Sequence, residues 1–369
     1  MTIKLFCSLG SLISGIAIAG LATTVHAQEK WTMTTAWPDN LDLIQIDRHW
    51  VETVNSIAGD ELKINFRAGG TLMPGYEVFD ATQAGSIQAA GDWPGYWAGR
   101  SSAFSPLATT TSLFNAVDYL NWIQQWGGFE LYQEVYGKFG MVYLPYGITN
   151  NESGFRGGTP IENLADLKGK RLRISGRDQG RVLEQLGGSQ VTLAAGEIYQ
   201  ALERGVIDGA ELTLPGIDYN LGLSEVTDYW LTPGWHQSAS VYGVMINKEA
   251  WDALSEETQK KLRIAADATM AWSIAWSERG ATEGTNKFLE DGTIINQLPE
   301  EDMAKIQDIT NQVIIQGACE DPMHAKIYHS MISYLEHYAT WRDISVPYNM
   351  SRTMDDLPSL DELETCMNK

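Results

Sequence analysis

The sequence predicts an α/β protein with two domains. Two separate series of the order β-α-β-α-β run through it, one ending near Ala90 and the other between about Glu152 and Trp235. Strands that alternate with helices form mainly parallel sheets covered by those helices. With 369 residues, 44% of them hydrophobic, the chain is long enough to bury two cores.

The first 27 residues have the composition of a signal peptide. Lys4 supplies a short positive start, residues 13–22 are apolar and rich in small side chains, and Val25-His26-Ala27 is a small-residue cleavage pattern. The apolar run is too short to predict a membrane span. We therefore expect residues 1–27 to be removed and a periplasmic mature protein to begin at Gln28.

The chain carries a large negative charge. Its formal net charge is -21, and loss of Lys4 would make it -22. Nucleic acids bind clusters of Lys and Arg through their phosphates, so this surface argues against a nucleic-acid partner. A small anionic ligand is still compatible with it, because one buried arginine outweighs a distant, screened acidic surface.

Alternating and helical hydrophobic patterns define a first domain over residues 28–150. Its predicted strands cover residues 31–37, 62–66, 87–90 and 141–148, and its predicted helices cover 43–57, 76–84 and 116–138. The loop after the third strand-like segment, 87–90, carries Trp93 and Tyr96, which we expect to line a pocket wall. The alternative is that both rings pack on the next helix.

Residues 149–154 break the pattern, and we expect the chain to cross there into a second domain of residues 151–237. Its strands are predicted near Leu172, Val191 and Ile207, and its helices near Arg181 and Ile198. A strand at 240–247 would return to the first domain, which about 238–300 would complete. C-terminal helices are predicted over 301–345, followed by a tail of residues 346–369.

A basic strand near the middle of the chain offers a ligand-binding arginine. Leu172, Arg173 and Ile174 follow a turn, and Gly176 ends the strand before a helix-like segment. Ligands of open α/β sheets bind beyond the carboxyl ends of the strands, where the guanidinium fork of Arg173 would suit a carboxylate. The alternative is a surface strand on which Arg173 is merely solvated.

Two cysteines remain after the signal peptide, Cys319 and Cys366. In an oxidising periplasm a disulfide between them would attach the C-terminal tail to a helix. Their spacing leaves this open, because the bond depends on the distance and direction of the two side chains.

Five segments together resemble a known family, the DctP-type solute-binding proteins of tripartite ATP-independent periplasmic (TRAP) transporters. The segments are Phe66-Arg67-Ala68-Gly69-Gly70, residues 167–176, residues 198–211, Pro233-Gly234-Trp235 and Val244-Met245-Ile246-Asn247-Lys248. The chain is most similar to the branch that binds 2-oxo acids and related hydroxy acids. The resemblance implies two lobes with mixed sheets, a cleft between the lobes, and a long helix that spans both.

The same resemblance implies partners and a binding mode. The family delivers a small organic acid to a membrane permease, and the arginine at the position of Arg173 pairs with the carboxylate of that acid. Some relatives dimerise through their C-terminal helices, and the helical pattern over 327–341 permits this. A cation, Na⁺ or Ca²⁺, is implied beside the ligand, held by Glu211, the backbone carbonyl of Leu212, and Gln237.

The sequence departs from the branch at three of these positions. Glu152, which is implied to contact the ligand, stands where the branch has glutamine, and Gln237 stands where it has glutamate. Leu212 stands where the branch has tryptophan, and loss of that indole would widen or reshape the pocket. Acid and amide have thus exchanged places while the carboxylate count is unchanged, and both groups offer oxygen to a hard cation.

Two neighbouring residues follow Pro233-Gly234 at the second crossing between the domains. We expect Trp235 to close an apolar side of the pocket, and His236 to lie near the cleft. The alternative for His236 is a structural role, which is the commoner fate of a lone histidine. Trp93 and Tyr96 would close the other apolar side.

Binding without catalysis explains the chain best. There is no Gly-x-Ser-x-Gly elbow, no His-Glu-x-x-His and no phosphate-binding loop, so we expect no enzymatic activity. Two alternatives stay open. One is a periplasmic hydrolase or isomerase acting through Glu152, Glu211 and His236, and the other is a sensor that signals to a membrane receptor.

Overall fold

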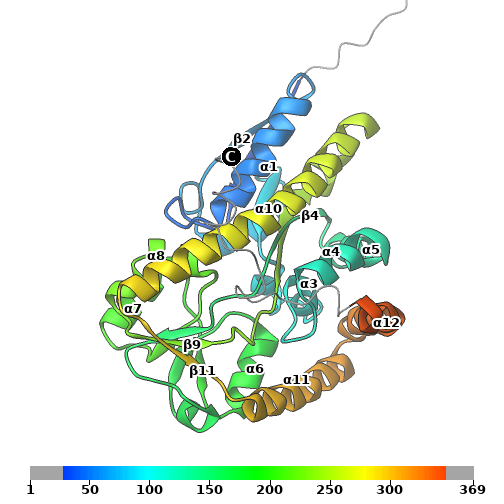
Figure 1. The fold of residues 1–369 in the computed structure, drawn as a ribbon. Coiled ribbons are helices and arrows are strands. Elements are labelled where there is room, and N and C mark those ends of the chain that lie inside the picture. Colours follow the sequence, from blue (N-terminus) through cyan, green and yellow to red (C-terminus); the bar gives the residue numbers. More distant parts are fainter. Residues whose placement is uncertain (1–27, 346–369) are drawn as a thin grey trace, which may run out of the picture.

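The computed structural model describes residues 28–345, so the predicted signal peptide, the predicted tail and Cys366 lie outside the described residues. The described chain forms two lobes, each built on its own sheet (Figure 1). No helix among these residues has the length and apolarity that crossing a membrane requires.

The first lobe contains a mixed sheet in the order β2-β1-β3-β10-β4. Strands β1, β2 and β3 run parallel, whereas β10 pairs antiparallel with both β3 and β4, so the predicted return of the chain to the first lobe is confirmed. Every residue of β4 and β10 is buried, which explains their nearly continuous apolar sequence. The strands are β1 Glu29–Thr35, β2 Leu62–Phe66, β3 Ala89–Asp92, β4 Met141–Thr149 and β10 Ser240–Asn247.

The second lobe contains a six-stranded mixed sheet in the order β11-β9-β5-β8-β6-β7. Strand β11 comes late in the chain and pairs parallel with β9. The expectation that about 238–300 would complete the first lobe therefore extends too far, because β11 belongs to the second sheet. The strands are β5 Phe155–Gly157, β6 Arg171–Arg173, β7 Ser189–Val191, β8 Gly209–Ala210, β9 Tyr229–Thr232 and β11 Ile294–Gln297.

The helices of the first lobe begin and end at recognisable signals. Asn115 caps α4 by accepting from the backbone of Asp118, whose side chain accepts from Asn115 in return. The single helix predicted over 116–138 is two helices, because Gly127 takes a left-handed conformation with φ of 79° between them. The helices are α1 Ile44–Ile57, α2 Val78–Gln83, α3 Phe104–Ala108, α4 Ala116–Gln125, α5 Gly128–Gly137 and α9 Lys248–Asp252.

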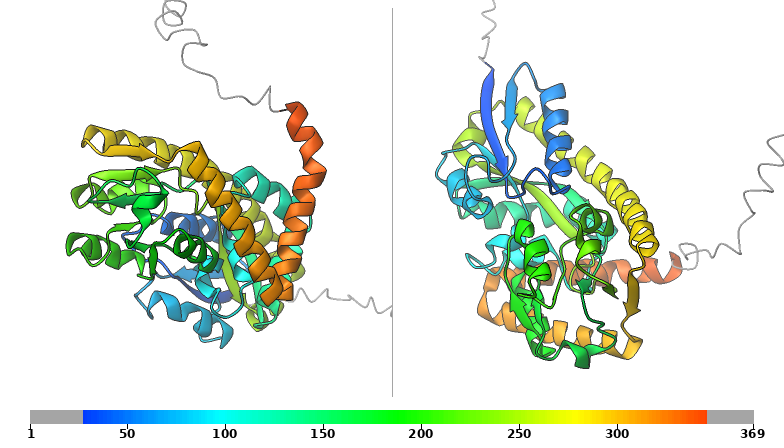
Figure 2. Two further views of the ribbon diagram at one scale, coloured as in Figure 1. Left: turned by 90° about the horizontal axis from the view of Figure 1, so that it is seen from below. Right: turned by 90° about the vertical axis from the view of Figure 1, so that its left-hand side faces the viewer.

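Helix α10 (Glu256–Glu290) crosses from one lobe to the other (Figures 1 and 2). It packs on α1 and β4 in the first lobe and on α8 (Pro215–Asn220) in the second. Glycines make the second contact close: a Cβ on Gly284 would lie 2.2 Å from the backbone nitrogen of Gly216. The expected helix that spans both lobes is thus present.

Four further helices complete the fold. Helix α11 (Glu300–Glu320) packs along α6 (Arg177–Gln185) of the second lobe, whereas α12 (Pro322–Ser345) packs on α3 and α5 of the first (Figure 2). Helix α7 (Ile198–Glu203) covers the second lobe near β8. The predicted C-terminal helical region is divided where α11 ends, at Glu320, because Asp321 is extended.

Three chain segments meet where the lobes join. The crossing after β4 reaches the loop after β9 through a hydrogen bond from the Glu152 nitrogen to the Gln237 carbonyl, 3.1 Å long. The same crossing reaches the loop after β8 through a bond from the Ser153 nitrogen to the Thr213 carbonyl, 2.8 Å long. These backbone bonds bring the side chains of the three segments together.

Candidate functional site

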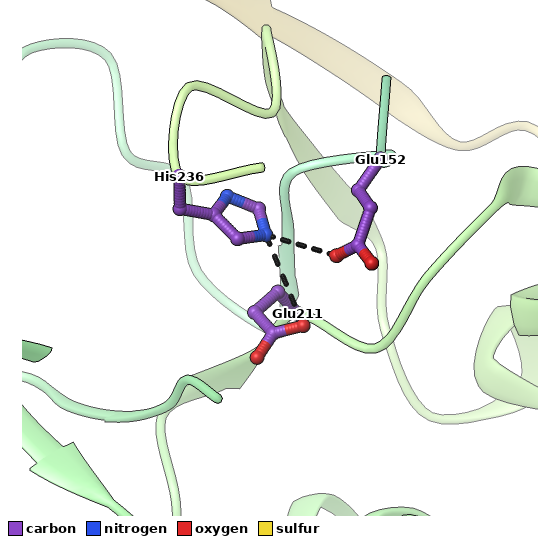
Figure 3. Close-up of side chains that lie close together, drawn as sticks. All are labelled: Glu152, Glu211 and His236. Atoms are coloured by element: carbon purple, nitrogen blue, oxygen red, sulfur yellow. Dashed lines mark hydrogen bonds and ion pairs between the residues drawn. The ribbon is translucent and has the colours of Figure 1, made fainter. Parts of the chain in front are cut away.

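Two acids and one histidine converge at this junction (Figure 3). Glu152 comes from the crossing after β4, Glu211 from the end of β8, and His236 from the loop after β9. The Nε2 atom of His236 lies 3.2 Å from Oε2 of Glu152 and 3.8 Å from Oε2 of Glu211. All three side chains are buried, so their interactions act in a water-poor environment.

Arg173 joins the cluster from the end of β6. Its Nη1 donates to Oε1 of Glu211 at 3.0 Å and to the Glu211 carbonyl at 2.9 Å, while Nε donates to the Leu193 carbonyl at 3.2 Å. Arg173 is 2% exposed, whereas its neighbour Arg171 is exposed and pairs with Asp208. A solvated surface role therefore fits Arg171 but not Arg173.

Burial controls the charges in the cluster. It raises the pKa of Glu211 to about 7 although the Arg173 guanidinium opposes the shift, and it raises the pKa of Glu152 well above the usual value. Burial also lowers the pKa of His236 to about 4. At neutral pH the imidazole is uncharged, and the Arg173 guanidinium is the positive charge that acts on both buried carboxyl groups.

A cavity of about 560 Å³ opens beside Arg173, between the two lobes. Its walls come from both lobes and include Tyr76, Tyr96, Arg173, Ser175, Arg177 and Gln190. The predicted wall residue Tyr96 is present, and its hydroxyl accepts from Trp37 Nε1 at 3.2 Å. Sequence reasoning missed Tyr76, although the Pro-Gly turn just before it was a signal of an exposed loop.

Trp93 lies behind Tyr96 and touches the opposite lobe. The two rings pack edge to face with centroids 5.2 Å apart. A Cβ on Gly176 of the second lobe would lie 3.5 Å from the Trp93 ring, so this indole contacts the start of α6 across the lobe boundary. Trp93 is buried and supports the wall that Tyr96 forms.

The remaining predicted site residues lie close to the cluster but differ in what they contact. Leu212 is buried directly after Glu211. Trp235 packs in the core of the second lobe with its ring 6.2 Å from that of Phe155. Neither Trp235 nor the cluster residues Glu152, Glu211 and His236 are among the residues that line the 560 Å³ cavity. Gln237 uses its side-chain oxygen to accept from Ser240 Oγ at 2.5 Å.

The cluster can hold a cation. Glu152, Glu211 and His236 each offer one ligand atom, and these atoms lie within 4.8 Å of one another. Oε2 of Glu211 is buried and receives no hydrogen bond from residues 28–345. A buried carboxylate oxygen without a donor is costly, and a bound cation would offset that cost.

Comparison with known proteins assigns the family. Residues 34–318 match the DctP family, described as bacterial extracellular solute-binding protein, family 7. The chain belongs to this family. The resemblance found in the five sequence segments is confirmed by the match.

Individual relatives match most of the chain in sequence or in fold. A monocarboxylate 2-oxoacid-binding periplasmic protein of Nostoc is 29% identical over 86% of each chain. A TRAP solute-binding protein of Bordetella bronchiseptica, with calcium and picolinate bound, has a TM-score of 0.83 at 26% identity, covering 87% of this chain and 96% of its own. One from Colwellia psychrerythraea, with calcium and pyruvate, has a TM-score of 0.83 at 25% identity, covering 89% and 100%. The two-lobed α/β fold expected from the sequence is thereby confirmed.

Proposed function

We propose that this protein is the periplasmic solute receptor of a TRAP transporter. It captures a small monocarboxylate, a 2-oxo acid or a hydroxy acid, together with a cation, and delivers it to the membrane permease. The observation that carries this proposal is the buried Arg173 at the edge of the interlobe cavity. The relatives from Nostoc and Colwellia support the ligand class, since they bind 2-oxo acids by their descriptions.

Arg173 is arranged to bind a carboxylate. Protein oxygens occupy its Nε and Nη1, whereas no residue among 28–345 accepts from Nη2. The free Nη2 offers a charge-assisted hydrogen bond to a ligand carboxylate in the cavity. Glu152 and Glu211 would hold a bound cation, which would offset the negative charge of their carboxylates. The backbone carbonyl of Leu212 would lie beside this cation.

A single substitution tests the proposal. Arg173→Lys removes the planar fork, and we expect it to weaken pyruvate binding at least roughly 100-fold in calorimetry, about 3 kcal/mol. Arg171→Lys on the same strand is the matched control and should bind normally, because Arg171 faces solvent and Asp208. Equal affinity of both variants for every 2-oxo and hydroxy acid tested would contradict the proposal.

We also propose that the protein dimerises through α12. Trp341 and Ile344, one helical turn apart near the end of this helix, are both exposed. Exposed apolar surface of this kind is typical of an interface. Native mass spectrometry should show a dimer, and Trp341→Glu should shift it to the monomer; a monomeric wild type would contradict this.

A further inference from the structure

We propose that His236 is itself a ligand of the bound cation, and that the site therefore prefers a divalent transition metal, such as Mn²⁺, Co²⁺ or Zn²⁺, over Na⁺ or Ca²⁺. This rests on the proposed function, because the same cleft binds the organic acid. It concerns which ion accompanies that acid.

The three side chains have the spacing of metal ligands. Nε2 of His236 lies between the two carboxylates, 3.2 Å from Glu152 and 3.8 Å from Glu211 (Figure 3). Ligand atoms on a tetrahedral ion with bonds of about 2.0–2.1 Å lie roughly 3.3–3.4 Å apart. Small side-chain adjustments would therefore place one ion in contact with all three atoms.

The carboxyl oxygens that face the histidine lack strong hydrogen-bond donors among residues 28–345. Arg173 and the Ser175 nitrogen both bond Oε1 of Glu211, whereas Oε2 of the same group receives no bond from the described residues. Oε2 of Glu152 lies 3.2 Å from Nε2 of the uncharged imidazole. An ion bound among these atoms would compensate both buried oxygens.

The nitrogen ligand decides the class of ion. Na⁺ and Ca²⁺ take sets of six or more oxygen ligands, whereas imidazole suits transition metals. Gln237, the amide expected to supply an oxygen, is bonded to Ser240 Oγ. Two carboxylates and one imidazole leave further positions open, and the carboxylate and keto oxygens of a 2-oxo acid can fill them together.

Packing against aromatic side chains fixes the position of the His236 ring. Its ring is 0% exposed and packs beside Phe155 and Trp235, with centroid distances of 5.5 and 5.8 Å. Nδ1 has no protein partner among residues 28–345. A metal ion bound to Nε2 would replace the hydrogen bond that this atom makes with Oε2 of Glu152.

The experiment compares ions on metal-free protein. Chelator-treated wild type, His236→Gln and the control His329→Gln, which alters an exposed histidine of α12, are titrated with Mn²⁺, Co²⁺, Zn²⁺ and Ca²⁺ in calorimetry, with and without pyruvate. We expect wild type and control to bind Co²⁺ and Zn²⁺ at least roughly 10-fold more tightly than Ca²⁺. His236→Gln should lose about 100-fold for these metals and little for Ca²⁺.

A spectroscopic measurement on the wild type does not depend on any variant folding. Pulsed EPR of the Mn²⁺-loaded protein should detect a directly bound nitrogen. Absence of that nitrogen, a preference for Ca²⁺, or unchanged affinities in His236→Gln would overturn the inference. If pyruvate or a hydroxy acid still binds with Ca²⁺ alone, the proposed function stands although the inference about His236 fails. If no acid binds with any ion, the proposed function itself fails.

Discussion

Replacing Arg156 by methionine should destabilise the protein severely, because Arg156 is one half of a buried ion pair. Its Nε donates to Oδ2 of Asp218 at 2.9 Å, and both side chains are 1% exposed. The guanidinium lies 4.1 Å from the Trp230 ring and 3.6 Å from that of Phe288 on α10. Arg156 therefore connects the second sheet, α8 and the helix that spans the lobes.

The magnitude follows from the charge left behind. Arg156→Met keeps much of the side-chain volume but leaves Asp218 buried, with only the Thr213 nitrogen donating to it within residues 28–345. Breaking a buried pair in this way costs about 3–5 kcal/mol. At about 2–3 °C per kcal/mol, the melting temperature should fall by roughly 6–15 °C.

A double-mutant cycle separates the charge from the packing. Arg156→Met with Asp218→Asn removes both charges, and the asparagine oxygen can still accept from Thr213. We expect the double variant to recover at least about 1–2 kcal/mol of the loss in urea unfolding. A single Arg156→Met variant that costs less than about 1 kcal/mol, or a double variant no more stable than the single one, would refute this reasoning.

Two further predictions concern stability. Burial raises the pKa of Asp47 to about 7 and that of Asp92 to about 8, so the folded state holds protons that the unfolded state releases above about pH 4. The stability that both groups contribute is therefore largest at low pH and is lost as the pH rises through 7 to 8. Asp92→Asn should flatten the fall in unfolding free energy between pH 5 and 8. A variant whose unfolding free energy falls as steeply with pH as that of the wild type would contradict this prediction. Gly284→Val would place a Cβ 2.2 Å from the Gly216 backbone, so it should lower the unfolding free energy by at least about 2 kcal/mol and separate α10 from α8. The control, Gly292→Val, lies at an open position with φ of 88° and should lower the unfolding free energy only by its local backbone strain.

Hydrophobic periodicity predicted the long elements well. The patterns over 43–57 and 62–66 coincide with α1 and β2, and the apolar run at 141–148 coincides with β4. Such segments bury a whole face or both faces, and burial imposes a period on the sequence. The return of 240–247 to the first sheet followed from the same argument.

Three strands of the second sheet, β5, β9 and β11, were not predicted, whereas the equally short β6 and β7 were expected near Leu172 and Val191. Strands β5 and β9 contain three and four residues, which is too few to show a period. Strand β11 is mostly exposed and joins the second sheet at its edge, so its sequence has no buried face to reveal. The break at Gly127 was missed because the apolar spacing continues through it.

The site was predicted in part. Arg173, Glu152 and Glu211 meet, as the resemblance to the DctP family implied, and His236 joins them from the loop after Pro233-Gly234. Trp235 and His236 are adjacent in a loop, where one step along the chain decides whether a side chain enters the core or the cluster. No periodicity governs that choice. Asp218 supports the loop after Glu211 through Thr213. It gave no signal because its charged partner, Arg156, is 62 residues away in the sequence.

Native mass spectrometry of the protein purified from the periplasm tests the central claim most directly. The account predicts that each chain carries the mass of one small organic acid and one metal ion, and that Arg173→Lys purified in parallel loses the acid. A wild-type protein that carries neither, and that gains no mass when mixed with 2-oxo or hydroxy acids and divalent ions, would contradict it.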